Sequence, residues 1–175
     1  MVDRPPAPAA RLGQPTKTEV LTILHDVKDP EVPVLSVVEL GIVRDVLFDG
    51  ERVTVRVTPT YSGCPAMQEI ESDILAALAR EGIADVAIET VYSPPWTTDW
   101  IGDEARGKLR AYGIAPPGAA EQGGLITLTR RRARVPCPWC GSADTTLKSE
   151  FGSTACKAIH FCKACSQPFD EFKAF

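Results

Sequence analysis

Two Cys-x-x-Cys pairs near the C-terminal end constrain the fold of this chain most. Cys137-Pro-Trp-Cys140 and Cys162-Lys-Ala-Cys165 are separated by 21 residues. A two-residue gap lets a short turn point both sulfurs inward, and Gly141 suits such a turn. Four thiolates at tetrahedral geometry form the ligand set of structural zinc, and the intervening segment is long enough for a β-hairpin. The spacing therefore predicts a zinc ribbon that holds one structural Zn²⁺.

Other interpretations of the C-terminal cysteines remain open. Four thiolates also suit iron, so an iron-sulfur cluster is the main alternative occupant, and ordinary reduced cysteines in a small core are another. Cys156 stands outside the pairs and is predicted to be a small buried residue, the alternative being a fifth thiol that competes for the metal. His160 could replace a ligand, although a surface or packing role is favoured.

The segment before the cysteines alternates between helical and strand patterns. Thr16 and Glu19 have the spacing of a capping box at the start of a helix, and Asp49-Gly50 suits the tip of a hairpin. The expected elements are a helix at 16–26, hairpin strands at 42–48 and 53–57, a helix after Pro65 with an apolar stripe of Ile70, Ile74, Leu75 and Leu78, a strand at 86–91, and a helix at 103–112 that packs Leu109 and Tyr112 on the core. This order predicts an α+β fold in which helices cover a small mixed sheet, followed by the zinc ribbon.

Composition along the chain predicts four segments. Residues 1–15 are rich in Pro and Ala without a hydrophobic period, which indicates a disordered leader. Residues 16–113 form the α/β domain. Residues 114–124 are rich in Pro, Gly and Ala and are expected to be a linker. Residues 125–175 are expected to form the ribbon, with residues 125–129 predicted as a strand that enters it.

Charge and hydropathy narrow the classes of partner. A net charge of -4 gives no overall attraction to phosphate backbones, which argues against nucleic acid as a partner. The longest apolar run, Ile74 to Ala79, is far shorter than the roughly 20 residues of a membrane span. The first residues lack an apolar signal segment, so we expect a cytoplasmic protein whose six cysteines serve metal or redox chemistry rather than disulfides.

Four segments of the α/β domain carry a family resemblance. They are Asp29-Pro-Glu31, Glu39-Leu-Gly-Ile-Val43, Thr58-Pro-Thr60-Tyr-Ser-Gly-Cys64-Pro65 and Val91-Tyr-Ser-Pro-Pro-Trp96-Thr-Thr-Asp99. Together they resemble the family of iron-sulfur assembly factors over about residues 16–113. The resemblance implies that Cys64 is the reactive or metal-handling thiol. The supporting loop residues would be Asp29, Glu31, Thr58, Thr60 and Trp96.

The chemistry of Cys64 follows from its expected place at the start of a helix. The positive end of the helix dipole would lower the pKa of the thiol and favour the thiolate that binds iron. The alternative is a buried cysteine that packs the helix start. Asp29 and Glu31 could simply cap and solvate a loop, and Trp96 could be a core aromatic rather than a lid over the thiol.

The C-terminal segments narrow the resemblance. Residues 137–142, 151–158 and 162–170 resemble the D subunits of the phenylacetyl-CoA 1,2-epoxidase system, and with the α/β domain the likeness covers the whole chain after residue 15. This implies a bacterial accessory protein of phenylacetate catabolism that does not itself catalyse the epoxidation. The residues agree, because the sequence has two histidines, no pair of Glu-x-x-His motifs for a di-iron centre and no Gly-x-Gly-x-x-Gly fingerprint.

The leading hypothesis is therefore a maturation or assembly factor. Cys64 would handle transient iron or an iron-sulfur species, and the ribbon would shape a surface for the oxygenase or reductase subunits, with the iron-sulfur assembly machinery as a further partner. The first alternative is a structural subunit that binds the oxygenase and has an inert Cys64. The second is a zinc-ribbon protein that binds nucleic acid through Arg130–Arg134.

Overall fold

The computed structural model describes residues 13–61, 63–118 and 134–175, which fall into two compact units divided between Pro94 and Pro95. Most of the predicted leader, residues 119–124 of the predicted linker, the predicted strand at 125–129 and most of the Arg130–Arg134 run lie outside the described residues. No helix in the described part of the chain is both long and apolar enough to cross a membrane.

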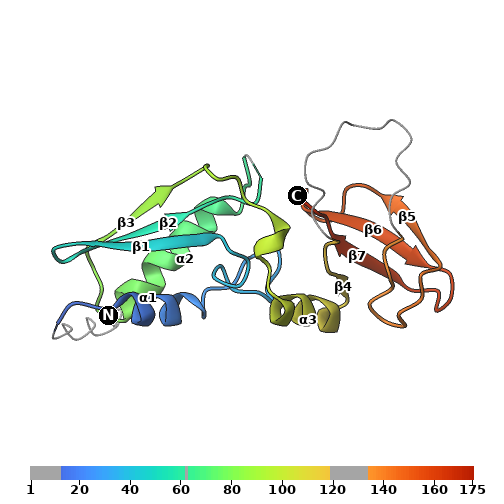
Figure 1. The fold of residues 1–175 in the computed structure, drawn as a ribbon, viewed down its shortest axis with the longest axis horizontal. Helices are drawn as coiled ribbons and strands as arrows, with labels where there is room; N and C mark the ends of the chain where they lie inside the picture. The colour runs from blue at the N-terminus through green and yellow to red at the C-terminus, as the bar shows by residue number, and fades with distance from the viewer. Residues whose placement is uncertain (1–12, 62, 119–133) are drawn as a thin grey trace, which may run out of the picture. The chain divides into compact units, whose positions relative to one another are not determined.

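The first unit is a three-stranded mixed sheet with two helices. Its elements are α1 (Lys17–Leu24), β1 (Val43–Asp49), β2 (Arg52–Val57), α2 (Met67–Arg80) and β3 (Val86–Thr90). The sheet order is β1-β2-β3, with β1 and β2 antiparallel and β2 and β3 parallel. Helix α2 makes the crossover between the parallel strands, and α1 contacts both α2 and β1 (Figure 1). The expected α+β architecture is confirmed.

Local signals explain the boundaries of these elements. The Thr16 side chain accepts a hydrogen bond from the Glu19 amide, and the Glu19 carboxylate accepts the Thr16 amide at 2.7 Å, so the capping box is formed. The hairpin turns at Gly50, whose positive φ of 58° favours glycine. These contacts fix where α1 begins and which residues of β1 and β2 pair.

The core of the first unit lies between the sheet and α2. The alternate residues Val53, Val55 and Val57 of β2 are fully buried, as are Ile70, Ile74 and Leu78 of α2. Leu75 was expected in the same stripe, but it is exposed, and Ala77 is buried instead. Position 75 follows position 74 by about 100° around the helix, so it turns away from the sheet.

The second unit contains a four-stranded sheet. Its elements are the 3₁₀ turn η1 (Thr98–Trp100), α3 (Asp103–Tyr112), β4 (Ile114–Ala115), β5 (Thr145–Ser149), β6 (Lys157–Cys162) and β7 (Pro168–Phe172). The sheet order is β4-β7-β6-β5, in which β5–β6 and β6–β7 are antiparallel and β4–β7 is parallel. The hairpin expected between the two cysteine pairs is thus β5 and β6.

The boundary between the units differs from the sequence prediction. The division falls at Pro94, so α3 belongs to the second unit and not to a domain that ends at residue 113. Ile114 and Ala115 were expected to begin a linker, but they are buried and pair with β7. The proline and glycine content of 114–124 is typical of a linker. Composition does not show that Ile114 and Ala115 pair with a strand more than 50 residues away, so the sequence prediction missed this pairing.

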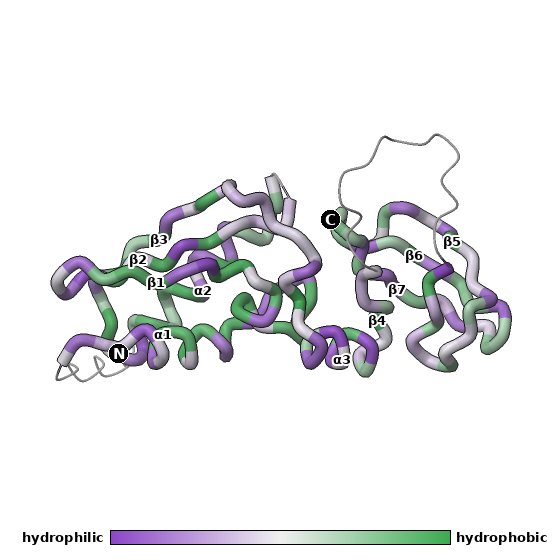
Figure 2. The backbone as a smooth tube through the Cα atoms, viewed as in Figure 1, coloured by the Kyte–Doolittle hydropathy of each residue, from purple (hydrophilic) through white to green (hydrophobic). Residues whose placement is uncertain are grey.

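Helix α3 buries a narrow stripe. It is mostly hydrophilic along its length (Figure 2), and its buried residues are Ala105 and Leu109. Tyr112 was expected against the core but is exposed. The helix ends at Gly113, which has a left-handed φ of 91°.

Candidate metal centre and reactive thiol

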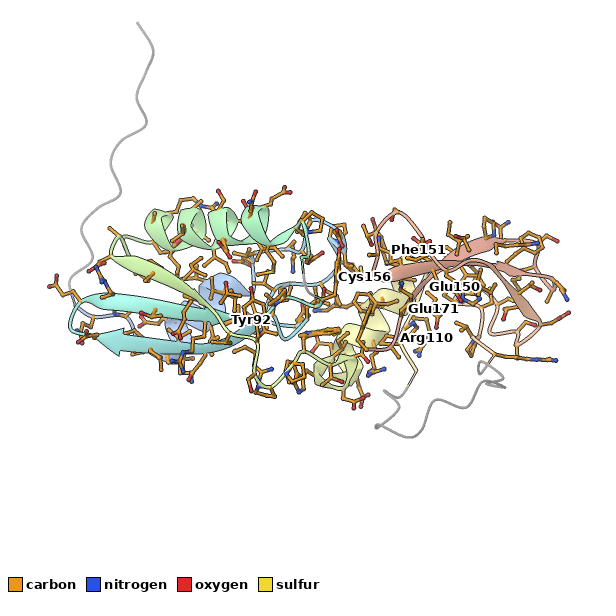
Figure 3. The ribbon with its side chains drawn as sticks, turned by 90° about the horizontal axis from the view of Figure 1, so that it is seen from above. Tyr92, Arg110, Glu150, Phe151, Cys156 and Glu171 are labelled. Carbon is orange, nitrogen blue, oxygen red and sulfur yellow. The ribbon has the colours of Figure 1, made fainter. Side chains whose placement is uncertain are left out.

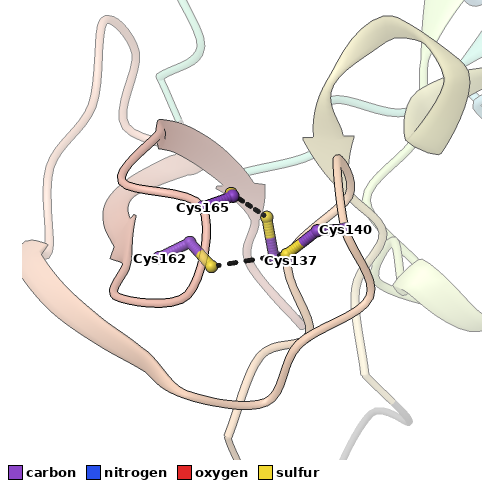
Figure 4. A group of neighbouring side chains, drawn as sticks. All are labelled: Cys137, Cys140, Cys162 and Cys165. Carbon is purple, nitrogen blue, oxygen red and sulfur yellow. Dashed lines mark hydrogen bonds between the residues drawn. The ribbon is translucent and has the colours of Figure 1, made fainter.

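The four paired cysteines converge on one point. The Sγ atoms of Cys137, Cys140, Cys162 and Cys165 all lie within 4.8 Å of one another (Figure 4). The Cys137 and Cys165 sulfurs are 3.7 Å apart, and those of Cys140 and Cys162 are 3.6 Å apart. A zinc ion bonded at about 2.3 Å to four sulfurs at tetrahedral angles separates them by about 3.8 Å. Both pairs therefore fit one ion and are much too long for disulfides.

Each pair sits in a turn that its own backbone closes. The Gly141 amide donates to the Cys137 carbonyl at 2.8 Å, and the Cys162 amide donates to the Gln167 carbonyl at 2.9 Å. Both turns use a positive φ, at Gly141 and at Ser166. The first turn precedes β5, and the second joins β6 to β7. The sheet therefore brings the two turns, and their sulfurs, together.

Backbone donors and burial give the sulfurs unequal acidities. The amide of Cys165 donates to the Cys162 sulfur and helps to lower the pKa of Cys162 to about 7. Burial raises the pKa of Cys165 to about 12, and the neighbouring thiols add to the rise. Four thiols this close resist full ionisation because the charges repel, and a divalent cation removes that obstacle. The donor set fits zinc.

A small hydrophobic cluster packs against this group. Ala115 and Phe169 are buried against Cys137 and Cys162. Cys156 is buried outside the tetrahedron, with its sulfur 3.0 Å from the Thr154 hydroxyl, in agreement with the predicted packing role.

His160 is the other C-terminal residue that could have served as a ligand. Its Nε2 lies 2.7 Å from a carboxylate oxygen of Glu171, and its ring stacks on Phe169. The four-atom metal group does not include it. Packing between β6 and β7 therefore accounts for this histidine, as the sequence favoured.

Cys64 lies in the turn between β2 and α2. Its amide donates to the Tyr61 carbonyl at 3.3 Å, and its carbonyl accepts the Met67 amide at 3.3 Å. The side chain is partly exposed. Helix α2 begins at Met67 and is capped by Ala66 without a side-chain hydrogen bond, so the thiol lies ahead of the first helical turn.

The acidic residues Asp29 and Glu31, in the loop after α1, act on this thiol through their charges. Asp29 is buried, and its Oδ1 accepts the amides of Glu31 and Val32 at 2.8 and 2.7 Å. Burial raises the pKa of the Cys64 thiol above its ordinary value, and the charges of Glu31 and Asp29 raise it further. The Ala66 amide opposes this rise, but burial is the largest cause. The expectation of a lowered pKa is therefore wrong, because desolvation and two nearby carboxylates raise it.

The other predicted supporting residues have separate surroundings. The buried Thr58 donates its hydroxyl to the Val91 carbonyl and its amide to the Ile42 carbonyl, which ties β2 to its neighbours. Thr60 is half-buried in the loop that leads to Cys64. Trp96 is buried in the second unit, with ring centroids 6.1 Å from Phe172 and 6.2 Å from Phe175. Asp29 and Glu31 thus influence Cys64 through their charges, whereas Thr58 and Trp96 are buried with contacts of their own.

The raised pKa of Cys64 predicts slow alkylation. At neutral pH the rate should fall below that of an exposed cysteine, and it should still be rising at pH 9 because the thiolate fraction grows until the pH passes the pKa. Replacing Glu31 by Gln should speed alkylation at pH 8 by about twofold, since one nearby negative charge is removed. Peptide-resolved mass spectrometry with iodoacetamide measures this, with Glu69→Gln on α2 as the matched control. A plateau below pH 8 would contradict the assignment.

Comparison with known proteins links both units to described families. Residues 17–90 match the family described as "Iron-sulfur cluster assembly protein", and residues 121–173 match the "PaaD zinc beta ribbon domain". The first match lies within the first unit, and the second contains all four clustered cysteines. The C-terminal module is a zinc ribbon.

Individual relatives match either about half of this chain or nearly all of it. The "Fe-S protein maturation auxiliary factor YitW" of Bacillus subtilis is 36% identical over 92 residues, which cover 51% of this chain and 89% of that protein. A domain of unknown function (DUF59) from Bacillus anthracis superposes with a TM-score of 0.50 at 28% identity, over 53% of this chain and 90% of that one. The Escherichia coli K12 protein named as the putative D subunit of 1,2-phenylacetyl-CoA epoxidase is 43% identical over 94% of this chain and 96% of its own length. A relative this similar over both modules shows that the chain belongs to the PaaD family.

Proposed function

We propose that this chain is an accessory component of a phenylacetyl-CoA epoxidase system and assists the maturation of a metal or iron-sulfur centre in another subunit. The observation that carries the proposal is the 43% identity to the Escherichia coli relative over both modules. The match of residues 17–90 to iron-sulfur cluster assembly proteins supports a maturation role. The free cysteines fit a reducing cytoplasm, where such a system would work.

Each module has a distinct part in this role. Cys64 supplies a soft sulfur ligand, and Asp29 and Glu31 supply carboxylates that act on it, a mixed set suited to holding iron in transit. Without iron, the raised pKa keeps the Cys64 thiol protonated. Binding of iron would displace this proton. Zinc at the four clustered cysteines would hold the ribbon rigid as a docking surface for the oxygenase or reductase subunits. The iron-sulfur assembly machinery would be the donor.

A structural subunit with an inert thiol is the second candidate. The partial burial and raised pKa of Cys64 favour it, because both suppress the thiolate at neutral pH. A nucleic-acid role has less support, since the net charge is -4 and most of the arginine run lies outside the described residues.

A deletion strain that expresses the other epoxidase subunits separates the two candidates. Under the maturation proposal, the oxygenase and reductase still copurify from this strain, but the iron or sulfide content of one of them falls. Restoring the chain restores that content. If the subunits retain their full metal content and instead fail to associate, the structural role is correct and the maturation role is not.

A further inference from the structure

A buried lysine stands where the loop that joins β5 to β6 enters β6. Lys157 follows this loop, is only 7% exposed, and directs its Nζ to the exposed Ser153, whose Oγ lies 3.2 Å away. The ammonium therefore runs from a buried stem back toward the loop surface. Figure 3 labels Glu150, Phe151 and Cys156, which belong to the same loop at one end of the ribbon.

The charge of Lys157 has no carboxylate partner among the described residues. Four of the six other described lysines pair with acids, namely Lys17 with Asp45, Lys28 with Glu39, Lys108 with Glu104 and Lys163 with Asp144. Lys157 has only the neutral hydroxyl of Ser153. An ammonium on a largely buried side chain is less hydrated than one on the surface, so the lack of a counter-ion is unfavourable. An external anion would supply the missing counter-charge locally, even though the net charge of -4 gives the chain as a whole no attraction to anions.

A second lysine lies against the same loop. Lys173 donates its amide to the Cys156 carbonyl at 2.9 Å and its Nζ to the Glu150 carbonyl at 3.3 Å. The same Nζ lies 5.1 Å from the centroid of Phe151 and 5.9 Å from that of Phe175. It too lacks a carboxylate partner among the residues that the structure describes. The loop thus carries two ammonium groups and one highly exposed aromatic ring.

The loop backbone adds further donors. The Gly152 amide and the Lys157 carbonyl close the loop at 2.8 Å, and the Lys157 amide donates to the Thr154 carbonyl at 3.2 Å. The amides of Ser153, Thr154 and Ala155 donate to no acceptor within the described residues. Successive unused amides beside a cation are the arrangement that binds phosphate in other loops.

We propose that the Gly152–Lys157 loop binds the phosphate group of a small organic phosphate. Lys157 supplies the charge, the Ser153 and Thr154 hydroxyls and the free amides supply hydrogen bonds, and the exposed ring of Phe151 contacts the organic part. A phosphate offers three oxygens to this set of donors, whereas a carboxylate offers two. This inference is independent of the role of Cys64. The sequence had singled out residues 151–158 only for their family resemblance.

Titration of the full zinc-loaded chain with inorganic phosphate, followed by ¹⁵N NMR, tests this site. We expect saturable shifts centred on the amides of residues 152–157. Lys157→Met should raise the Kd at least about tenfold, because it removes the charge of a charge-assisted hydrogen bond. Lys148→Met is the matched control, since this exposed lysine on β5 contacts the Phe161 ring and not the loop, and it should change the Kd less than about twofold.

Two further measurements keep the test decisive. If Lys157→Met fails to fold, Ser153→Ala, at an exposed position, should still weaken binding severalfold, and Glu150→Gln should tighten it by removing a negative charge from the loop. A parallel titration with adenosine monophosphate separates the sources: tighter binding than phosphate, lost in Phe151→Ala, supports the organic ligand. Equal affinity for both would leave a simple phosphate site and overturn the organic part. Shifts spread over the surface, or unchanged by Lys157→Met and Ser153→Ala, would overturn the site.

Discussion

Replacing Cys162 by serine is expected to abolish metal binding and unfold the ribbon. Cys162 is fully buried, and its sulfur lies 3.6 Å from that of Cys140 within the four-sulfur group. Serine removes one of four ligands and leaves a hydroxyl in a core formed with Ala115 and Phe169. Metal ligation in modules of this kind contributes folding free energy on the order of 10 kcal/mol, far more than so small a core supplies.

The measurement combines metal analysis with amide protection. Zinc should fall from about one equivalent per chain to almost none, and residues of β5, β6 and β7 should lose protection from hydrogen exchange while β1–β3 keep theirs. Cys156→Ser is the matched control, because Cys156 is also buried in the ribbon but bonds to Thr154 outside the tetrahedron. It should retain zinc at a cost of about 1 kcal/mol. Full zinc in Cys162→Ser, or loss of zinc in Cys156→Ser, would refute the ligand assignment.

The features that sequence predicted well are those set by close neighbours in the chain. The capping box of Thr16 and Glu19 and the glycine turns at Gly50 and Gly141 depend on residues a few positions apart. The convergence of the four cysteines followed because the Cys-x-x-Cys turns fix two sulfurs each and leave only one long-range contact to be made. The fold class could also be predicted, because the hydrophobic period of each segment is a local pattern that distinguishes helices from strands.

The features that sequence missed depend on contacts between distant residues. No local pattern shows that Ile114 pairs beside Asp170 of β7, or that Trp96 packs on Phe172 in the second unit. The direction of the Cys64 pKa was missed for a related reason. Sequence shows a cysteine ahead of a helix, but burial and the charge of Glu31, more than 30 positions away, decide its acidity.

The proposed maturation role predicts that Cys64→Ser lowers epoxidation without unfolding the chain. Serine keeps the size of the side chain at a partly exposed turn, so the first unit should stay folded and its association with the epoxidase subunits should change less than twofold. It removes the soft ligand for iron, and because altered outer-shell groups alone cost about 10–100-fold in metal affinity or activity, loss of the thiol should lower cellular phenylacetyl-CoA epoxidation at least about tenfold.

Two controls define what such a loss means. Cys156→Ser removes the other cysteine outside the tetrahedron and should leave epoxidation unchanged. Glu31→Gln keeps the thiol but removes a carboxylate that raises its pKa, so it should favour the thiolate while weakening a mixed iron site. A drop in epoxidation for Cys64→Ser, with less iron or sulfide in the copurified subunits, fits an iron-handling thiol. Normal epoxidation with normal metal content would mean that Cys64 is inert and that the chain acts through binding alone.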